Sequence, residues 1–310
     1  MAAQAQMTNP TPTVLLDSVT KRFGDFTAVD NLSLAALPGR IYGLLGPNGA
    51  GKTTSIRMIV NITVPDSGEI KWFGRNITPG LQDRIGYLPE ERGLYKKMKI
   101  SEQLRFFAEL KNVAGNVIEE RIDNWLARLN LTQWKNKKAF ELSKGMQQKV
   151  QFITAILHEP DLLILDEPFS GLDPVNVELM KNIVLEQKSA GRTIIFSTHQ
   201  MELAEKICDD ICLINRSKKV LEGRLREVRQ SFGQNAVALR IEGGDGILAD
   251  SSLVASLKQH SDEVEAVLAA GVSGQELLRR LVNSGASVTK FEMIEPRLHD
   301  IFIQKVSEVA

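Results

Sequence analysis

The first segment with residue types suited to chemistry is Gly46-Pro47-Asn48-Gly49-Ala50-Gly51-Lys52-Thr53-Thr54. Glycines at this spacing let successive backbone N–H groups turn toward phosphate oxygens. Lys52 can reach the β- and γ-phosphates of a nucleotide, and the Thr53 hydroxyl can coordinate Mg²⁺. An ordinary glycine turn before a core helix is the alternative, but it does not account for the whole motif. The segment therefore predicts a binding loop for a nucleoside triphosphate.

Three further polar side chains follow apolar runs that are typical of buried strands. The run 162–165 leads into Asp166 and Glu167, and the run 193–198 is followed by His199. Parallel strands bring their carboxyl ends to one edge of an α/β sheet, where ligands bind. We expect Asp166 to be a Mg²⁺ partner, Glu167 a general base that polarises water, and His199 a γ-phosphate contact. The competing interpretations are a pair of helix-capping acids and a structural histidine.

The elements that must position these residues alternate between strands and helices. The apolar run 41–45 predicts a strand before the glycine-rich loop, and 52–60 predicts a helix after it. Apolar residues recur at helical spacing between about 101 and 129, with Ser101 as an N-cap, which predicts an inserted helical block that serves packing. Ser143 and Gly145 stand where the next helix would start. Helix starts attract anions, although a plain capped helix also explains these two residues.

The composition excludes several classes of protein. Lys plus Arg and Asp plus Glu number 38 each, so no global basic field indicates nucleic-acid binding. Two cysteines are too few for a disulfide framework. No apolar run approaches the ~20 residues that span a bilayer, and the first residues lack the pattern of a secretion signal. We expect a disordered tail over 1–13, a main domain over 14–233 with a helical subdomain at about 98–160, and an accessory domain over 234–310.

Taken in order, these motifs resemble those of the ATP-binding subunit of ABC transporters, over roughly 14–228. On that resemblance, 46–54 is the Walker A loop, 162–166 is the Walker B strand, and Glu167 is the catalytic carboxylate. His199 corresponds to the switch histidine. The resemblance implies a P-loop NTPase fold of the ABC type, which is an α/β fold with a mixed sheet and an inserted helical subdomain. It also implies ATP and Mg²⁺ as cofactors.

Other family positions are matched as well. The stretch Leu142-Ser143-Lys144-Gly145-Met146 stands at the signature position, and 170–173, which ends on Asp173, corresponds to the D-loop. Phe23 takes the place of the adenine-stacking aromatic, whereas the residue alone is equally consistent with a core or turn filler. In the family, two ATP molecules bridge a head-to-tail dimer. Ser143, Gly145 and Asp173 would then face the nucleotide that a second subunit holds.

Two positions depart from the family pattern. The usual signature is LSGGQ, and here Lys144 replaces a glycine and Met146 replaces the glutamine. Glu90 stands where the family has the glutamine of the Q-loop. A carboxylate oxygen also suits a hard cation, but it adds negative charge beside a triphosphate. We therefore expect Glu90 to contact the metal still, with altered coupling to the membrane subunits.

The segment 234–310 carries no catalytic motif and predicts a small α+β domain. We expect strands at 237–241 and 287–293 and helices at 274–281 and 296–306. Its ending, 294–302, resembles the accessory domain of ABC export ATPases of the sodium- or drug-efflux type. A structural or dimer-supporting role and the sensing of an effector are the two interpretations of this domain.

The resemblance thus implies an ATP-hydrolysing subunit that powers an exporter. Its partners would be integral-membrane permease subunits and a second ATPase subunit, in a homodimer or a mixed pair, peripheral to the cytoplasmic face of the inner membrane. The alternative is a soluble mechanical ABC ATPase that acts on ribosomes or chromosomes. It conflicts with the single set of motifs and with the ~90 residues between Lys52 and Ser143, which leave no room for a long coiled coil. A regulator without turnover conflicts with the intact Lys52, Asp166, Glu167 and His199.

Overall fold

The computed structural model describes residues 10–91, 93–232, 236–260, 263–294 and 296–309. The chain divides into two compact units, 1–225 and 226–310, rather than after residue 233. Most of helix α7 (Leu225–Ser231) therefore counts with the second unit, where Arg229 Nε donates a hydrogen bond of 3.1 Å to Pro296 O. The expected tail lies outside the described residues up to position 9. Thr13 N donates a 2.8 Å hydrogen bond to Ala36 O, so the ordered main unit includes Thr13.

A six-stranded sheet of order β10-β9-β3-β8-β7-β6 forms the centre of the first unit. Strand β10 is antiparallel to β9, and the other neighbours are parallel, which confirms the mixed α/β sheet. Every residue of β3, β7 and β8 is buried, which is why these strands are continuous apolar runs. The strands are β3 (Ile41–Leu45), β6 (Ile85–Leu88), β7 (Leu162–Asp166), β8 (Thr193–Thr198), β9 (Asp210–Asn215) and β10 (Lys218–Arg224).

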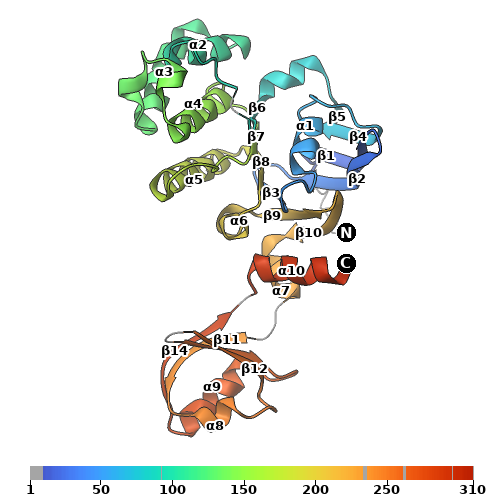
Figure 1. Cartoon of the computed structure of the whole chain (residues 1–310), viewed down its shortest axis with the longest axis vertical. Coiled ribbons are helices and arrows are strands. Elements are labelled where there is room, and N and C mark those ends of the chain that lie inside the picture. Colours follow the sequence, from blue (N-terminus) through green and yellow to red (C-terminus); the bar gives the residue numbers. More distant parts are fainter. Residues whose placement is uncertain (1–9, 92, 233–235, 261–262, 295, 310) are drawn as a thin grey trace, which may run out of the picture. The chain divides into compact units, whose positions relative to one another are not determined.

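A second, antiparallel sheet of order β2-β1-β4-β5 lies on the same side of the first sheet as helix α1 (Lys52–Ile59) (Figure 1). One core cluster joins Trp72 of this sheet, Met58 of α1 and Ile164 of the central sheet. The helix that follows the glycine-rich loop is therefore held between the two sheets. The strands are β1 (Val14–Phe23), β2 (Phe26–Ala36), β4 (Ser67–Trp72) and β5 (Arg75–Asn76).

The predicted helical block is present, and Figure 1 shows α2 (Ile100–Leu110), α3 (Gly115–Arg128) and α4 (Lys144–Ile156) gathered at one end of the unit. The N-cap prediction for Ser101 is wrong. The N-cap is Lys99, whose N–H donates a 3.1 Å hydrogen bond to the Glu102 carboxylate, while Ser101 is buried in the first turn. The remaining helices of the unit are α5 (Pro174–Ser189), α6 (Met201–Ile207) and the short 3₁₀ turns η1 (Pro79–Arg84), η2 (Thr132–Trp134) and η3 (Ala139–Glu141).

His158, just after α4, joins this block to the sheet through a 3.1 Å contact between Nε2 and Ile85 O. Burial lowers the pKa of His158 to about 4, and the charge of Lys111 acts in the same direction. The unfolded chain takes up this proton near pH 6.5, whereas the folded chain does so only near pH 4. The contribution of a neutral His158 to the free energy of unfolding is therefore fully present above pH 6.5. It is lost as the pH falls toward 4, by at most about 3 kcal/mol.

We expect urea denaturation at pH 7 and pH 5 to show this loss in the wild type. In a His158→Gln variant, the free energy of unfolding should change less between pH 7 and pH 5 than in the wild type, because the titrating imidazole is gone. Equal pH dependence in the two proteins would contradict the assignment of this share to His158.

The second unit has the element order β-α-β-β-α-β and the antiparallel sheet order β12-β13-β11-β14, which is a ferredoxin-like arrangement. Leu277 and Leu281 of α9 pack against Val237 and Leu239 of β11. The predicted α+β class is confirmed, but α10 begins at Leu298, and β12, β13 and α8 were not predicted. The elements are β11 (Ala236–Glu242), α8 (Asp245–Leu248), β12 (Val254–His260), β13 (Glu263–Leu268), α9 (Gly274–Asn283), β14 (Ser287–Ile294) and α10 (Leu298–Val309).

Candidate functional site

The glycine-rich loop connects β3 to α1 and has the backbone that its sequence requires. Gly46, Gly49 and Gly51 have φ values of 152°, 78° and 108°, a region that side chains rarely adopt. Gly51 is also the N-cap of α1, and a Cβ there would lie 2.4 Å from Ala28 O. Behind the loop, Ser217 N donates a 3.1 Å hydrogen bond to Ala50 O. The loop is thus held from behind by β2 and by the β9–β10 turn.

Gly51→Ala should be destabilising for two reasons, a positive φ and a collision with Ala28 O. We expect a loss of more than about 2 kcal/mol in the free energy of unfolding, together with weaker nucleotide binding. Gly49→Ala is the matched control, because its φ is also positive but no atom lies within 4 Å of the added Cβ. That variant should lose only about 1 kcal/mol. If urea denaturation gives the same loss in free energy of unfolding for both variants, the contact between the added Cβ and Ala28 O costs nothing, which would contradict this prediction.

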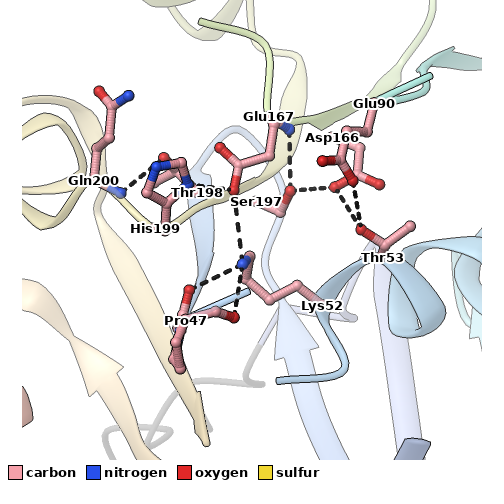
Figure 2. Close-up of polar contacts among 11 residues, drawn as sticks. Pro47, Lys52, Thr53, Glu90, Asp166, Glu167, Ser197, Thr198, His199 and Gln200 are labelled. Carbon is pink, nitrogen blue, oxygen red and sulfur yellow. Dashed lines mark hydrogen bonds and ion pairs between the residues drawn. The ribbon is translucent and has the colours of Figure 1, made fainter. Parts of the chain in front are cut away.

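Lys52, the first residue of α1, turns back over the loop (Figure 2). Its Nζ donates hydrogen bonds to Gly46 O at 2.9 Å and to Pro47 O at 3.1 Å, and lies 3.6 Å from Glu167 Oε1. The side chains of Lys52 and Glu167 are 6% and 8% exposed, so this ion pair is largely screened from water. The carbonyl groups that accept from Lys52 Nζ are neutral. An anion that enters the loop can replace them as the hydrogen-bond acceptor of the ammonium group.

Glu167 links the lysine to the end of the neighbouring strand. Its Oε1 lies 3.0 Å from His199 Nδ1, so one carboxylate oxygen contacts both Lys52 and His199. The backbone of Glu167 is left-handed, with φ 48°, which is a strained conformation for a residue with a side chain. Strain of this kind gathers at functional sites, where the surrounding structure imposes it. The structure thus brings together the three residues that the sequence proposed for catalysis.

Asp166, Thr53 and Glu90 meet beside the first turn of α1 (Figure 2). Thr53 Oγ1 lies 3.3 Å from Glu90 Oε2 and 3.4 Å from Asp166 Oδ1. Burial raises the pKa of Asp166, and the negative charges of Glu90 and Glu167 add to this effect, whereas hydrogen bonds from Ser197 and Thr53 oppose it. All three residues proposed to bind metal are therefore adjacent.

These residues fit a hard cation. Asp166 Oδ2 is buried and has no hydrogen-bond partner among the described residues. A buried carboxylate oxygen without a partner is costly, and a metal ion or a water bound to it would remove that cost. Within the described ranges, no group of three or more His, Cys, Asp or Glu side chains is arranged to hold a metal ion by protein ligands alone. A Mg²⁺ ion shared with nucleotide phosphates is compatible with that finding, because such ions keep few protein ligands.

The remaining candidates lie elsewhere. Phe23 ends β1 with 54% exposure, and Lys21 Nζ lies 5.6 Å from its ring centroid.

Ser143 is the N-cap of α4 as predicted, and its side chain accepts a hydrogen bond from Met146 N, at 3.3 Å. Asp173 is the N-cap of α5 and accepts from Asn176 N at 3.0 Å. A Cβ on Gly145 would lie 3.4 Å from Leu172, in the segment before Asp173. No described contact joins Ser143, Gly145 or Asp173 to Lys52.

One residue of the site was missed. Ser197 Oγ donates a hydrogen bond to Asp166 Oδ1 and accepts one of 3.1 Å from Glu167 N. Ser197 lies opposite Asp166 in the parallel register of β7 and β8. Its hydroxyl thereby orients the aspartate and the backbone of the neighbouring glutamate. The only sequence signal was a hydroxyl near the end of a buried strand, because strand register is not visible in the sequence.

Comparisons with known proteins point to one family. Residues 29–170 match the family model described as ABC transporter, and residues 223–306 match the model for the C-terminal domain of DrrA1-3-like ATP-binding proteins. The uncharacterised ABC transporter ATP-binding protein YhaQ of Bacillus subtilis is 46% identical over 95% of this chain and 98% of its own length. Nod factor export ATP-binding protein I of Rhizobium meliloti is 32% identical over 98% of this chain and 91% of its own.

Solved structures are similar as well. The structure of an ATP-binding subunit of an ABC transporter has a TM-score of 0.67 and 30% identity, covering 71% of this chain and 93% of its own. The structure of cbiO1 from Clostridium perfringens, part of the ABC transporter complex cbiONQ, has a TM-score of 0.62 and 27% identity, covering 72% and 92%. No helix of the described residues is both long and apolar enough to cross a membrane. The phosphate loop, the acids beside it and these relatives together show that the chain belongs to the ATP-binding, ATP-hydrolysing subunits of ABC transporters.

Proposed function

We propose that this ATP-hydrolysing subunit uses ATP with Mg²⁺ to power export through separate membrane subunits. The observation that supports its chemistry best is the Glu167 carboxylate, which is held between Lys52 Nζ at 3.6 Å and His199 Nδ1 at 3.0 Å. A carboxylate at the edge of the phosphate loop can accept a proton from water that attacks the γ-phosphate. The export direction is supported by relatives that are named as Nod factor export proteins.

Each residue has one role in this proposal. Lys52 exchanges the carbonyls of Gly46 and Pro47 for the β- and γ-phosphates, and loop N–H groups surround these oxygens. Glu167 orients the water and takes its proton. His199, which is 47% exposed, donates to the γ-phosphate oxygens as charge spreads over them. Phe23, also exposed, stacks on the adenine.

Thr53, Asp166 and Glu90 would hold the Mg²⁺. When bound, the ion supplies positive charge that offsets the charge of the phosphates. Ser197 holds Asp166 in position for this contact.

A second subunit completes the site. Ser143 and the Gly145 N–H lie at the start of a helix and have no described contact with Lys52, so a copy that approaches head to tail would supply them. Asp173 would contact the nucleotide across the same interface. The pair would close on ATP and open after hydrolysis removes the bridging phosphate.

The loop after Glu90 and an adjoining cavity are the proposed contact with a permease. The cavity measures about 450 Å³ and is lined mainly by apolar residues, with Gly93 and Leu94 from the loop itself. Positive charge in and just after this loop would suit the contact: Lys96, Lys97 and Lys99 are exposed, and position 92 lies outside the described residues. We therefore place the protein at the cytoplasmic face of the membrane, bound through its partners.

Reconstitution tests this proposal. The chain would be co-expressed with a candidate membrane protein from a neighbouring gene, purified as a complex and placed in vesicles with the ATPase outward. With ATP and Mg²⁺ outside, an exporter moves cargo into the lumen, which a sodium indicator or ethidium fluorescence would report. ATP-driven loss of preloaded cargo would contradict export. Co-purification with ribosomes and no membrane protein would favour the mechanical alternative, which the transporter relatives do not support.

A further inference from the structure

Gln151, on α4, is a buried polar residue without a role in the mechanism above. It is 3% exposed, and its Nε2 donates to Pro89 O at 3.3 Å and to Glu91 O at 3.0 Å. Both N–H groups of the amide are therefore used on the main chain, one on each side of Glu90. Its Oε1 is buried and has no partner among the described residues. An unpaired buried acceptor costs about 1–3 kcal/mol, so this amide is a poor choice for stability alone.

Glu90 depends on this attachment. It lies in an exposed loop just after β6, and its carboxylate lies 3.3 Å from Thr53 Oγ1, which is also 3.4 Å from Asp166 Oδ1. The neighbouring Glu91 side chain is 87% exposed and lies only at the limit of contact with Arg57, at 3.5 Å. The two bonds from Gln151 therefore hold the backbone on both sides of Glu90, next to the metal-binding residues.

Other polar residues of α4 reach different segments. Gln147 Nε2 donates to Ala139 O and Leu142 O, both at 3.0 Å, and Gln148 Nε2 donates to Pro168 O at 3.2 Å. Lys149 Nζ donates to Leu129 O at 2.8 Å and lies 3.1 Å from Asn176 Oδ1. Among the described hydrogen bonds of α4 side chains, those of Gln151 alone hold the segment 89–91. Among the described residues, this amide thus supplies the side-chain hydrogen bonds that join α4 to the backbone on both sides of Glu90.

We propose that Gln151 is a positioning residue that holds Glu90 at the magnesium side of the nucleotide and links this position to helix α4. The inference rests on the proposed use of ATP with Mg²⁺. It predicts that movement of α4 changes how the metal is held, because the two carbonyls that flank Glu90 move with the helix. Groups that orient metal ligands without touching the metal commonly contribute tenfold or more to metal affinity.

Gln151→Met tests the proposal, because methionine keeps the length of the side chain but cannot donate. Binding of a fluorescent ATP analogue would be measured in Mg²⁺ and in EDTA, at protein concentrations too low for pairing. We expect the enhancement by Mg²⁺ to fall about tenfold, with the affinity in EDTA within about twofold of wild type. Hydrogen exchange of a peptide that contains residues 89–91 should become faster without any nucleotide.

Gln147→Met is the matched control, because it also removes two side-chain hydrogen bonds to backbone carbonyls from α4. It should leave the Mg²⁺ enhancement unchanged. Glu90→Ala should lower the enhancement by itself, and adding Gln151→Met to it should cause no further loss, since the two residues act through one contact.

An unchanged enhancement in Gln151→Met would overturn the proposal, as would a full additional loss in the Glu90→Ala background. If the methionine variant does not fold, Gln151→Asn carries the same expectation, because its shorter amide cannot reach both carbonyls. A Glu90→Ala variant with wild-type enhancement would also overturn it. Failure of the proposed function looks different, because the wild-type chain itself would then show no Mg²⁺-dependent ATP binding.

Discussion

Glu167→Gln should slow ATP hydrolysis by about two to four orders of magnitude, which is the loss expected when a general base is removed. The amide has the shape of the carboxylate and can still accept from Lys52 Nζ, so the loop geometry should persist. ATP binding should therefore remain. Since the γ-phosphate is not cleaved, the protein should accumulate as an ATP-bound pair, visible as a doubled mass in light scattering with ATP and Mg²⁺.

Glu91→Gln is the matched control, because it removes a nearby carboxylate whose side chain is 87% exposed. Its turnover should stay within about twofold of wild type, as is usual for exposed positions. Unchanged turnover in Glu167→Gln would remove this residue from its role as base. Lost turnover together with lost ATP binding would show a structural effect instead.

Lys52→Met should weaken ATP binding by about 10²- to 10⁴-fold, because two charge-assisted hydrogen bonds to phosphate are lost at roughly 1.5–3 kcal/mol each. It should also destabilise the folded chain, since Glu167 is 8% exposed and loses its cationic neighbour. Calorimetric titration with ATP and thermal unfolding would measure the two effects separately.

The double variant Lys52→Met with Glu167→Gln separates binding from stability. It removes the buried carboxylate, so the melting temperature should recover while ATP binding stays lost. Lys137→Met, which removes a lysine whose side chain is 54% exposed and pairs with Glu141, should change neither property. Wild-type ATP affinity in Lys52→Met would mean that the loop N–H groups alone hold the phosphates.

Local spacing in the sequence was sufficient to predict the phosphate loop, the acids at the end of β7 and the histidine after β8. Each is a motif of short range, in which a few adjacent residues determine turn geometry or strand burial. Gly46 to Thr54 predicted the loop because its three glycines have positive φ values that other residues rarely adopt, and because a helix begins directly after Gly51. The helical block was equally visible, since its apolar residues recur at helical spacing.

Contacts across strands and between distant elements were not visible. Ser197 orients Asp166 because β8 lies beside β7 in one particular register, and no pattern in either strand specifies that register. Gln151 reaches Pro89 and Glu91 only because α4 packs against β6. Strands β12 and β13 were missed because neither forms an apolar run. In β12 the residues 255–259 are exposed, and in β13 only Ala266 and Leu268 are buried. The sequence by itself determined which chemical groups are available for the proposed nucleotide site. The packing of sheet and helices decided which side chains hold those groups in place, because such contacts depend on distances in space that spacing along the chain does not encode.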